Sequence, residues 1–262
     1  MILLDEVDST NTYAKIHFDE LQNLSLVSAR CQTAGVGRLG RKWFSSKDRD
    51  ITATAVLKDI SDGFHAGIIC GLAVLTLIRQ MTPDSISFFK WPNDIYIGNR
   101  KLCGILSEGI IRNRSLAGVV CGMGINVNSS FEELQHAGQP ATSLSIESGS
   151  NFDIIFLTEK LENLIHRCYI KSNSDFQSVF ELWKRENRLI GNLIEVVDPT
   201  GTRFTGVFRD IDSSGAMLMQ CGSREKIFSC GDVKIDITGT DWDVMRQAIC
   251  NNGDALLKEF PE

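Results

Sequence analysis

The chain has 262 residues, 43% of them hydrophobic, which is enough for one large domain or for a main domain with a small appendage. Its net charge of −6 argues against non-specific nucleic-acid binding. No apolar run reaches the roughly 18 residues of a membrane span, and the acidic start differs from a secretory signal. The eight cysteines form no CxxC pair, which predicts reduced thiols, a cytoplasmic protein and no zinc site.

Periodic patterns of apolar residues divide most of the chain into elements. In chain order these are a strand at Ile2–Val7, a helix from Ser9 or Thr10 to Leu24, strands at Leu24–Arg30 and Ile51–Leu57, a core helix at Phe64–Met81, strands at Ile86–Lys90, Asp94–Ile97, Lys101–Gly109 and Leu116–Gly122, a loop at Ser129–Pro140, and amphipathic helices at Asn151–Ile170 and Asp175–Asn187. Consecutive strands joined by short turns favour an antiparallel or mixed sheet in an α+β fold.

The pattern changes after Gly191, where short strands alternate with tight turns. The expected strands are Leu193–Val197, Thr205–Ile211, Ala216–Cys221, Lys226–Phe228 and Val233–Ile237. Strands of this length and spacing are typical of a small β-barrel. We therefore expect a main domain at residues 1–188, a C-terminal module at 189–237, and a weakly patterned tail at 238–262 to which no role is assigned.

A glycine motif lies at Gly35-Val36-Gly37-Arg38-Leu39-Gly40. It matches the GxGxxG dinucleotide fingerprint, but that fingerprint requires a helix opening at the glycines, and no helix of the right length fits the residues from Arg41 onward. The better interpretation is a flexible loop whose Arg38, Arg41 and Lys42 supply donors for phosphate or carboxylate groups. Residues 30–58 hold seven Lys/Arg against two Asp. A purely structural loop is the alternative.

Short polar side chains, Asp8-Ser9-Thr10-Asn11, fall at a predicted strand-to-helix junction. A helix cap needs one of them, so the others could bind the amide or urea group of a ligand, with Gln32 joining from the next strand. Further along, Gly122-Met123-Gly124-Ile125-Asn126 ends another strand, and its glycines would let a flat ligand lie against the backbone.

The most specific segment is Lys90-Trp91-Pro92-Asn93-Asp94, followed by Lys101 and Gly104 at the start of the next strand. Two lysines, a carboxylate that could bind a metal and a glycine that allows close approach thus fall within about one hairpin. Each residue alone is equally typical of a turn or a solvated surface. Together they indicate a site for an anionic, phosphate-bearing reactant.

The four histidines (17, 65, 136 and 166) fall in helix or loop contexts away from these segments. No Ser/His/Asp or Cys/His arrangement is suggested. Chemistry without a histidine base indicates electrostatic catalysis of phosphoryl or nucleotidyl transfer, in which positioning and charge matter most.

In this order, the motifs resemble the biotin protein ligases, and the resemblance extends from about residue 3 to about residue 237. It implies a mixed-sheet catalytic domain of the biotin/lipoate ligase type, followed by a small SH3-like barrel. The implied activity is that of a biotin–[biotin carboxyl carrier protein] ligase. Biotin and MgATP give biotinyl-5′-AMP and pyrophosphate, and the acyl group then passes to a lysine on the carrier domain of a biotin-dependent enzyme such as acetyl-CoA carboxylase.

The resemblance also implies roles for individual residues. Lys101 and Arg38 would be catalytic, and Asp94 would bind Mg²⁺, which with ATP is a co-substrate; no tightly bound metal is expected. The biotin site would comprise Ser9, Thr10, Asn11, Gln32, Gly35, Val36, Gly37, Arg38, Lys101, Gly104 and Gly122. The nucleotide site would comprise Arg38, Arg41, Trp43, Lys90, Asn93, Asp94 and Asn126. The loop at 129–143 would cover adenine.

Two departures from the family pattern affect these expectations. Val36 stands where the family loop usually carries Arg, which predicts weaker ordering of the loop without ligand and weaker biotin binding. The chain also begins at the catalytic domain, whereas some relatives carry an N-terminal winged-helix domain, so DNA binding is not expected. Family members can dimerise by extending the sheet, and a homodimer is one expectation here.

Two alternatives remain at the level of the sequence. A lipoate–protein ligase would share the fold and reaction logic, but the Lys90–Asp94 segment and the C-terminal barrel favour biotin. A non-catalytic biotin-binding module would keep the pocket without chemistry, but pure binding does not require phosphate-directed groups such as Lys101, Asp94 and Arg38.

Overall fold

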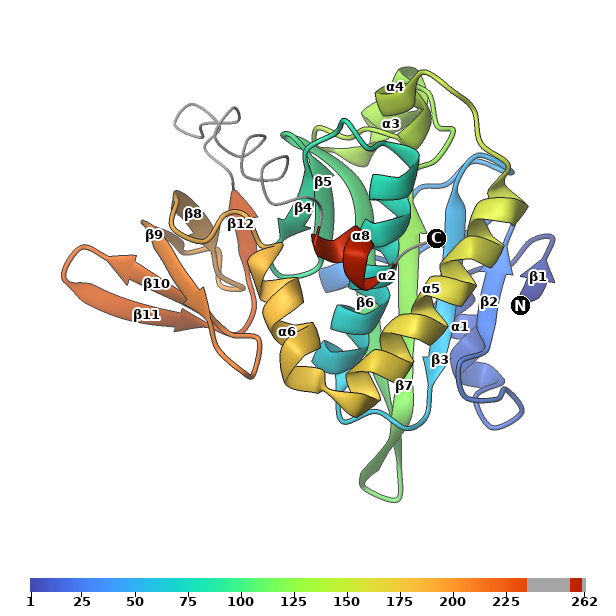
Figure 1. Cartoon of the computed structure of the whole chain (residues 1–262), viewed down its shortest axis with the longest axis horizontal. Coiled ribbons are helices and arrows are strands. Elements are labelled where there is room, and N and C mark those ends of the chain that lie inside the picture. Colours follow the sequence, from blue (N-terminus) through green and yellow to red (C-terminus); the bar gives the residue numbers. More distant parts are fainter. Residues whose placement is uncertain (235–254, 261–262) are drawn as a thin grey trace.

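The larger of the two sheets in the described part of the chain has seven strands in the order β1-β2-β3-β7-β6-β5-β4 (Figure 1). β1 and β2 are parallel, whereas all other neighbours are antiparallel, so the predicted mixed sheet is confirmed. The computed structural model describes residues 1–234 and 255–260. The strands are β1 (Ile2–Leu4), β2 (Leu26–Ala29), β3 (Ile51–Leu57), β4 (Ser87–Lys90), β5 (Asp94–Ile97), β6 (Arg100–Arg112) and β7 (Ser115–Ile125).

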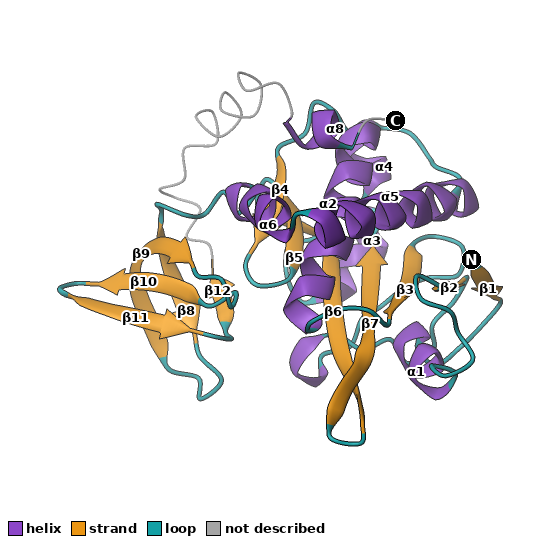
Figure 2. Cartoon of the chain, turned by 60° about the horizontal axis from the view of Figure 1, so that its bottom comes forward, coloured by secondary structure: helices purple, strands orange, loops and turns teal. Residues whose placement is uncertain are grey.

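Helices cover one face of this sheet (Figures 1 and 2). The central helix is α2 (Gly63–Met81), which packs on β6 and β7 and is covered in turn by α5 (Ile154–Ser174) and α6 (Phe176–Arg185). Within the described residues α2 is the one helix long and apolar enough to cross a membrane, but 72% of its apolar window is buried inside the fold. Burial on all sides is typical of a core helix and explains its continuous apolar sequence.

The opposite face is covered in part by α1 (Thr10–Ile16), which packs on β3 and β7. Its apolar contacts form a second, smaller core with Phe18, Leu21 and Val120. The predicted helix was too long, because the chain leaves the helix after Ile16 and Leu24 adopts a positive φ of 67°. Leu21 contributes to the core from the turn rather than from a helix.

The segment after β7 is not the plain loop that was predicted. It forms α3 (Phe131–Leu134), a 3-10 turn η2 (Gln135–Ala137) and α4 (Leu144–Ser148). A capping box causes the first of these turns, because Ser130 and Glu133 each bond the backbone N–H of the other. A polar sequence with Gly and Pro concealed this local signal.

The C-terminal module is a five-stranded antiparallel sheet in the order β11-β10-β9-β8-β12, which agrees with the predicted small β module. Its strands are β8 (Leu193–Val197), β9 (Arg203–Ile211), β10 (Met217–Cys221), β11 (Arg224–Phe228) and β12 (Asp232–Lys234). The domain limits at 188 and 237 stay predictions. Residues 235–237 of the expected barrel, and most of the tail at 238–262, lie outside the described residues.

The end of the tail has structure of its own. The short helix α8 (Ala255–Glu259) contacts α2, and Leu256 and Phe260 are buried in the main core. Part of the segment to which no role was assigned therefore completes the helical layer.

Direct contacts join the module to the main sheet. The Trp91 indole Nε1 donates to the carbonyl of Gly215 at 2.9 Å, and Lys184 of α6 pairs with Asp210 of β9 at 2.7 Å. At the connection between the two units, the buried Glu186 side chain pairs with Arg79 of α2 at 2.6 Å. The turn between β4 and β5, which carries the most specific sequence segment, is therefore placed beside the module.

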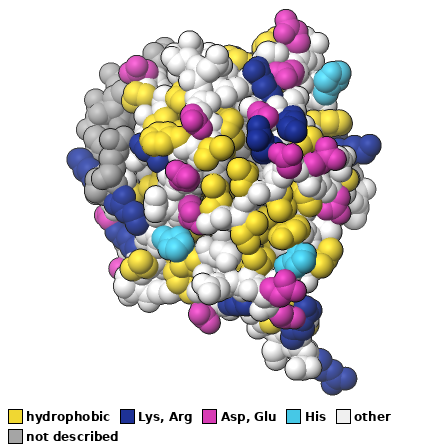
Figure 3. Space-filling view, turned by 90° about the vertical axis from the view of Figure 1, so that its right-hand side faces the viewer, with side chains coloured by type: hydrophobic (Ala, Val, Ile, Leu, Met, Phe, Trp, Pro, Cys, Tyr) yellow, Lys and Arg dark blue, Asp and Glu magenta, His cyan; other side chains and the backbone are white. Residues whose placement is uncertain are grey.

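Strand β1 is one edge of the larger sheet, and its exposed side chains are apolar. Ile2 and Leu3 are 36% and 43% exposed. Figure 3 looks at this side of the molecule and shows apolar side chains gathered across its middle, with charged groups around them. An apolar edge is compatible with the expected homodimer, which stays a prediction.

Candidate active site

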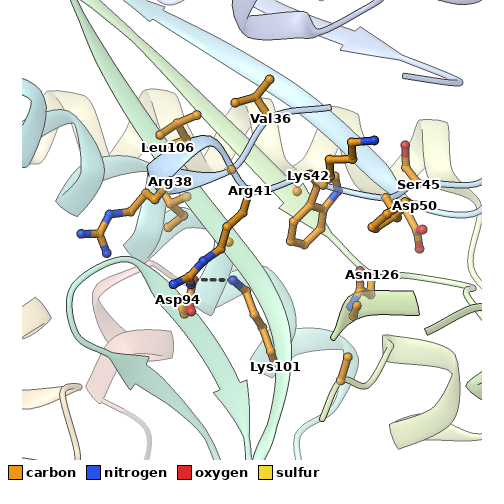
Figure 4. A pocket seen from close by; sticks show the side chains of 18 of the residues that line it. Val36, Arg38, Arg41, Lys42, Ser45, Asp50, Asp94, Lys101, Leu106 and Asn126 are labelled. Atoms are coloured by element: carbon orange, nitrogen blue, oxygen red, sulfur yellow. Dashed lines mark ion pairs between the residues drawn. The ribbon is translucent and has the colours of Figure 1, made fainter. Parts of the chain in front are cut away.

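A cleft of about 940 Å³ holds the candidate site. It lies on the face of the sheet opposite α2, beneath the glycine–arginine loop (residues 35–43), and Figure 4 shows this loop above the strands. Every residue assigned to the site from the sequence lines the cleft except Gly35. The geometry thus brings the predicted biotin and nucleotide residues into one space, while their individual roles stay predictions.

One region of the cleft, which we call the polar end, comprises Ser9, Thr10, Asn11 and Gln32. Ser9 occupies the N-cap position of α1 without a side-chain cap bond, and Gln32 replaces it: its Oε1 accepts from the Thr10 N–H at 2.8 Å and from the Thr10 hydroxyl at 3.0 Å. A carboxamide from the segment that follows β2 therefore caps the helix. Ser9, with its hydroxyl beside the cleft, stays available to a ligand.

Asn11 is held by hydrogen bonds rather than left free for a ligand. Its Nδ2 donates to the Leu106 carbonyl at 3.2 Å and to Glu108 at 2.8 Å, and its Oδ1 accepts from the buried Thr54 hydroxyl at 2.6 Å. Lys15 in turn pairs with Glu108, and this pair and the Asn11 bond hold the pKa of the Glu108 carboxyl below its usual value against the cost of burial.

Gly122 leaves room for the Asn11 side chain, and its expected contact with a ligand stays a prediction. A Cβ on Gly122 would lie 2.3 Å from Asn11 Oδ1, so a side chain there is sterically incompatible with the Asn11 position. Gly124 lies two residues further along β7, on the same face of the sheet. A Cβ on Gly124 would lie as close as 2.3 Å to the ring atoms of Trp43. The glycines admit protein side chains that themselves form the wall of the cleft.

The glycine–arginine loop is a hairpin. The Gly37 N–H donates to the Arg41 carbonyl at 2.7 Å, and the Trp43 N–H donates to the Gly35 carbonyl at 2.9 Å. Its tip, Arg38–Gly40, is a single 3-10 turn followed by extended chain, which confirms that this GxGxxG motif does not open a dinucleotide-binding helix. The hairpin places the side chains of Arg38 and Arg41 in the lining of the cleft.

Trp43 closes the base of the hairpin. Its ring lies against Gly104 and Gly124, and the Lys101 ammonium is 5.7 Å from the ring centroid. Its buried Nε1 has no hydrogen-bond partner among the described residues. An orphaned buried donor beside a cavity is a group that a bound molecule could satisfy.

We call the opposite region of the cleft, formed by Arg38, Arg41, Lys90 and Lys101, the cationic end. The Lys101 Nζ lies 2.7 Å from Asp94 Oδ1, and Figure 4 shows Arg41 reaching toward Asp94 from the loop while Lys101 approaches from its strand. Arg41 pairs with Asp232, and Arg38 donates to Asn93 Oδ1 at 2.9 Å. Strand order explains the grouping, since β4, β5 and β6 are adjacent in the sheet.

Lys90, at the end of β4, is partly buried. Its Nζ donates to the Tyr96 hydroxyl at 3.1 Å and lies 4.7 Å from the ring centroid. Burial lowers the pKa of Lys90 and raises that of Tyr96. A buried ammonium without a carboxylate partner in the described part of the chain favours an incoming anion.

Two buried polar groups anchor the chain that continues from β7. Asn126 Nδ2 donates to the Thr142 carbonyl at 2.9 Å. Asp50 accepts from the Val127 N–H at 2.9 Å and from the Ser129 hydroxyl at 2.6 Å, and burial raises the pKa of Asp50 to about 6. These bonds fix the segment expected to cover adenine, so both residues position the rim of the cleft.

Sequence reasoning missed several lining residues. Asp50 and Asp232 line the cleft without any local motif, and Asp232 comes from the C-terminal module. His136 of η2 also lines it, so the expectation that all histidines lie away from the site was wrong for that residue. Only Asp50 carries a sequence signal, because it is a carboxylate directly before the apolar strand at Ile51–Leu57.

Comparison with known proteins agrees with this geometry. Residues 3–126 match the model of the biotin/lipoate A/B protein ligase family. The bifunctional ligase/repressor BirA of Salmonella typhimurium is 28% identical over 89% of this chain and 73% of its own length, and the biotin–[acetyl-CoA-carboxylase] ligase of Mycobacterium tuberculosis is 29% identical over 78% of this chain and 76% of its own. A structure of the biotin protein ligase of Aquifex aeolicus, in complex with biotin and ATP, matches with 25% identity and a TM-score of 0.72 over 89% of this chain and 97% of that one.

The fold matches that of a biotin protein ligase, and the relatives named as biotin–[acetyl-CoA-carboxylase] ligases support an enzyme of this class. The similarity to the biotin/lipoate A/B protein ligase family lies in the main domain, at residues 3–126. Two of the three relatives compared above are named as biotin ligases, which favours that branch over lipoate ligases.

Proposed function

We propose that this chain activates biotin with ATP as biotinyl-5′-AMP and transfers the acyl group to a lysine of the carrier domain of a carboxylase. The observation that carries the proposal is the position of Lys101 in a single cleft, between the glycine wall at Gly104 and the Asp94 carboxylate. An ammonium placed there can contact the carboxylate of the acid and the α-phosphate at the same time.

The first step is attack of the biotin carboxylate on the α-phosphate with release of pyrophosphate. Negative charge collects on the phosphoryl oxygens, and Lys101 and Arg38 stabilise it in a cleft that limits access of water. In the second step the amine of the carrier lysine attacks the acyl carbonyl and AMP leaves. No nucleophile from this chain is required.

Magnesium would enter with ATP. Within the described residues no group of three His, Cys, Asp or Glu could form a metal cage, so a binding site made of protein alone is not expected there. Asp94 Oδ1 is buried, and no described donor besides Lys101 reaches it. One carboxylate together with substrate phosphates suits Mg²⁺, which would balance phosphate charge when bound.

Pyrophosphate release in the presence of biotin and MgATP tests this function. We expect biotin-dependent release that falls at least a hundredfold in Lys101→Ala, because the group that bridges both reactants is removed. Lys226→Ala is a matched control, since Lys226 also lies over an aromatic ring, that of Phe204, but in the C-terminal module. It should retain the wild-type rate.

Competing acids and acceptors separate the alternatives. Release with lipoate and not with biotin would assign the chain to the lipoate branch. Tight biotin binding by folded protein with no release would indicate a binding module and refute the proposed reaction. Transfer of biotin to a purified carrier domain tests the second step separately.

A further inference from the structure

The four cations at the cationic end have two kinds of partner. Lys101 and Arg41 face carboxylates, those of Asp94 and Asp232. Arg38 and Lys90 instead donate to neutral oxygens, those of the Asn93 amide and the Tyr96 hydroxyl. In residues 1–234 and 255–260, therefore, half of the positive charge is neutralised before any substrate binds, and half is open to an anion.

Asp232 differs from Asp94 because it belongs to the other structural unit. It is the first residue of β12, where it pairs with Val197 of β8, and with Val233 it lines the cleft. The Trp91–Gly215 hydrogen bond holds the module beside the cationic end. The C-terminal module thus contributes an acidic side chain to a site otherwise built by the main sheet.

Arg41 also determines the position of the loop that carries it. Its carbonyl accepts the Gly37 N–H that closes the hairpin, so holding Arg41 holds the Arg38–Gly40 tip. The bond to Asp232 raises the pKa of Arg41. The pair is accessible, with 60% of the Arg41 side chain and 34% of the Asp232 side chain exposed, and ion pairs of this kind are weak enough to exchange partners.

We propose that the Asp232 carboxylate is a positioning group of the active site: it holds Arg41, and with it the glycine–arginine loop, until a triphosphate replaces it. This inference rests on the proposed function, since ATP would supply the triphosphate. Phosphate oxygens match the guanidinium donors at least as well as a single carboxylate does, and they carry more charge. Once Arg41 binds phosphate, repulsion between Asp232 and the nucleotide frees the loop from the module to cover the reactants.

Asp232→Asn tests the proposal because it keeps the shape of the side chain and removes its charge. Without the competing carboxylate, MgATP should bind about two- to fivefold tighter in a direct titration, and the gain should shrink in high salt. Biotin affinity should be unchanged. Asp232→Glu, which keeps the charge, should remain close to the wild type.

Limited trypsin digestion of the unliganded protein gives a second readout, since Arg38, Arg41 and Lys42 are cleavage sites in the loop. Cleavage at these sites should be several times faster in Asp232→Asn because the loop is no longer held. Asp210→Asn is the matched control: it breaks another ion pair between the module and the main domain, Lys184–Asp210, which involves no residue of the loop.

Tighter MgATP binding and faster loop cleavage in Asp232→Asn, with neither in Asp210→Asn, would support the proposal. Unchanged or weaker MgATP binding, unchanged cleavage, or equal effects in both variants would overturn it. If the unmodified chain released no pyrophosphate with biotin, the proposed function would fail, but the cleavage comparison needs no substrate and would still decide whether Asp232 holds the loop.

Discussion

The polar and cationic ends of the cleft are built in opposite ways. At the polar end, Thr10, Asn11 and Gln32 join a hydrogen-bond network with Thr54 that Glu108 anchors through Asn11, and Thr10, Asn11 and Thr54 are at most 5% exposed. At the cationic end, long side chains form ion pairs and half of the cations lack a carboxylate within the described part of the chain. Satisfied buried networks are rigid, whereas exposed ion pairs exchange partners easily.

This contrast suits the two reactants that we assign to the cleft. A neutral bicyclic ring system is selected by shape and by fixed donors and acceptors, which must be in place before it binds. A triphosphate is recognised by charge, and the groups that bind it can move to new partners as it arrives. Changes at the polar end should therefore impair both folding and affinity, whereas changes at the cationic end should mainly affect nucleotide binding and rate.

Gly122→Ala should produce the largest combined effect at the polar end. The new Cβ would lie 2.3 Å from Asn11 Oδ1, so either Asn11 must leave its position or β7 must shift. Overpacking of this kind costs about 1–3 kcal/mol of stability. We expect a loss of that size in urea unfolding together with a loss of biotin affinity of about tenfold or more in calorimetric titration.

Gly109→Ala on the paired strand β6 is the control, since its Cβ would meet the flexible end of Leu116 at 3.1 Å. That variant should retain biotin affinity. If Gly122→Ala bound biotin as tightly as the unmodified chain, the polar end could not be a preformed binding surface for biotin.

The next largest expected effect is the contribution of Asp50 to the pH dependence of the unfolding free energy. Burial raises the pKa of Asp50 to about 6 in the folded chain, above the value of about 4 expected when the chain is unfolded. Between these values the folded state binds more protons, so the Asp50 contribution to stability falls as pH rises from about 4 through 6. The loss amounts to about 3 kcal/mol at most.

Asp50→Asn removes this titration while keeping an acceptor for the Val127 N–H. The unfolding free energy of the variant minus that of the wild type should therefore increase as pH rises from 4 to 7 and then level off. Glu133 is the titratable neighbour that contributes to the shift, so Glu133→Gln should be measured in parallel. Curves for Asp50→Asn and wild type that stay parallel across this range would contradict the assignment.

The sequence was sufficient to predict most of the fold. Alternating or continuous apolar runs define β3, α2 and the strands from β4 to β7, and these elements have strong local patterns. The two failures occurred where local chemistry or tertiary contacts dominate: the turn after Ile16, which Leu21 stabilises by packing, and the Ser130–Glu133 capping box within a polar segment.

The sequence predicted many of the residues that line the cleft, but it did not predict the contacts that hold them in place. The motifs could be grouped from the sequence because several of them lie on strands that are adjacent in the sheet. The sequence could not show that Gln32 caps α1, that Gly122 accommodates Asn11, or that Asp232 pairs with Arg41, since each contact joins residues distant in sequence. Such contacts leave no periodic pattern in the sequence.

Val36→Arg should have the smallest effect and tests where the two regions meet. Val36 is half exposed, and Figure 4 shows it on the loop above the strands, at the rim of the cleft that it lines. A guanidinium there would add a donor for the carboxylate of the acid, so we expect biotin to bind about two- to fivefold tighter, with little change in MgATP affinity. Val36→Gln, which lacks the charge, should show less than half of that gain in binding free energy. An unchanged biotin affinity in Val36→Arg would mean that the loop contacts biotin only after the nucleotide has bound, and that the hairpin belongs functionally to the cationic end alone.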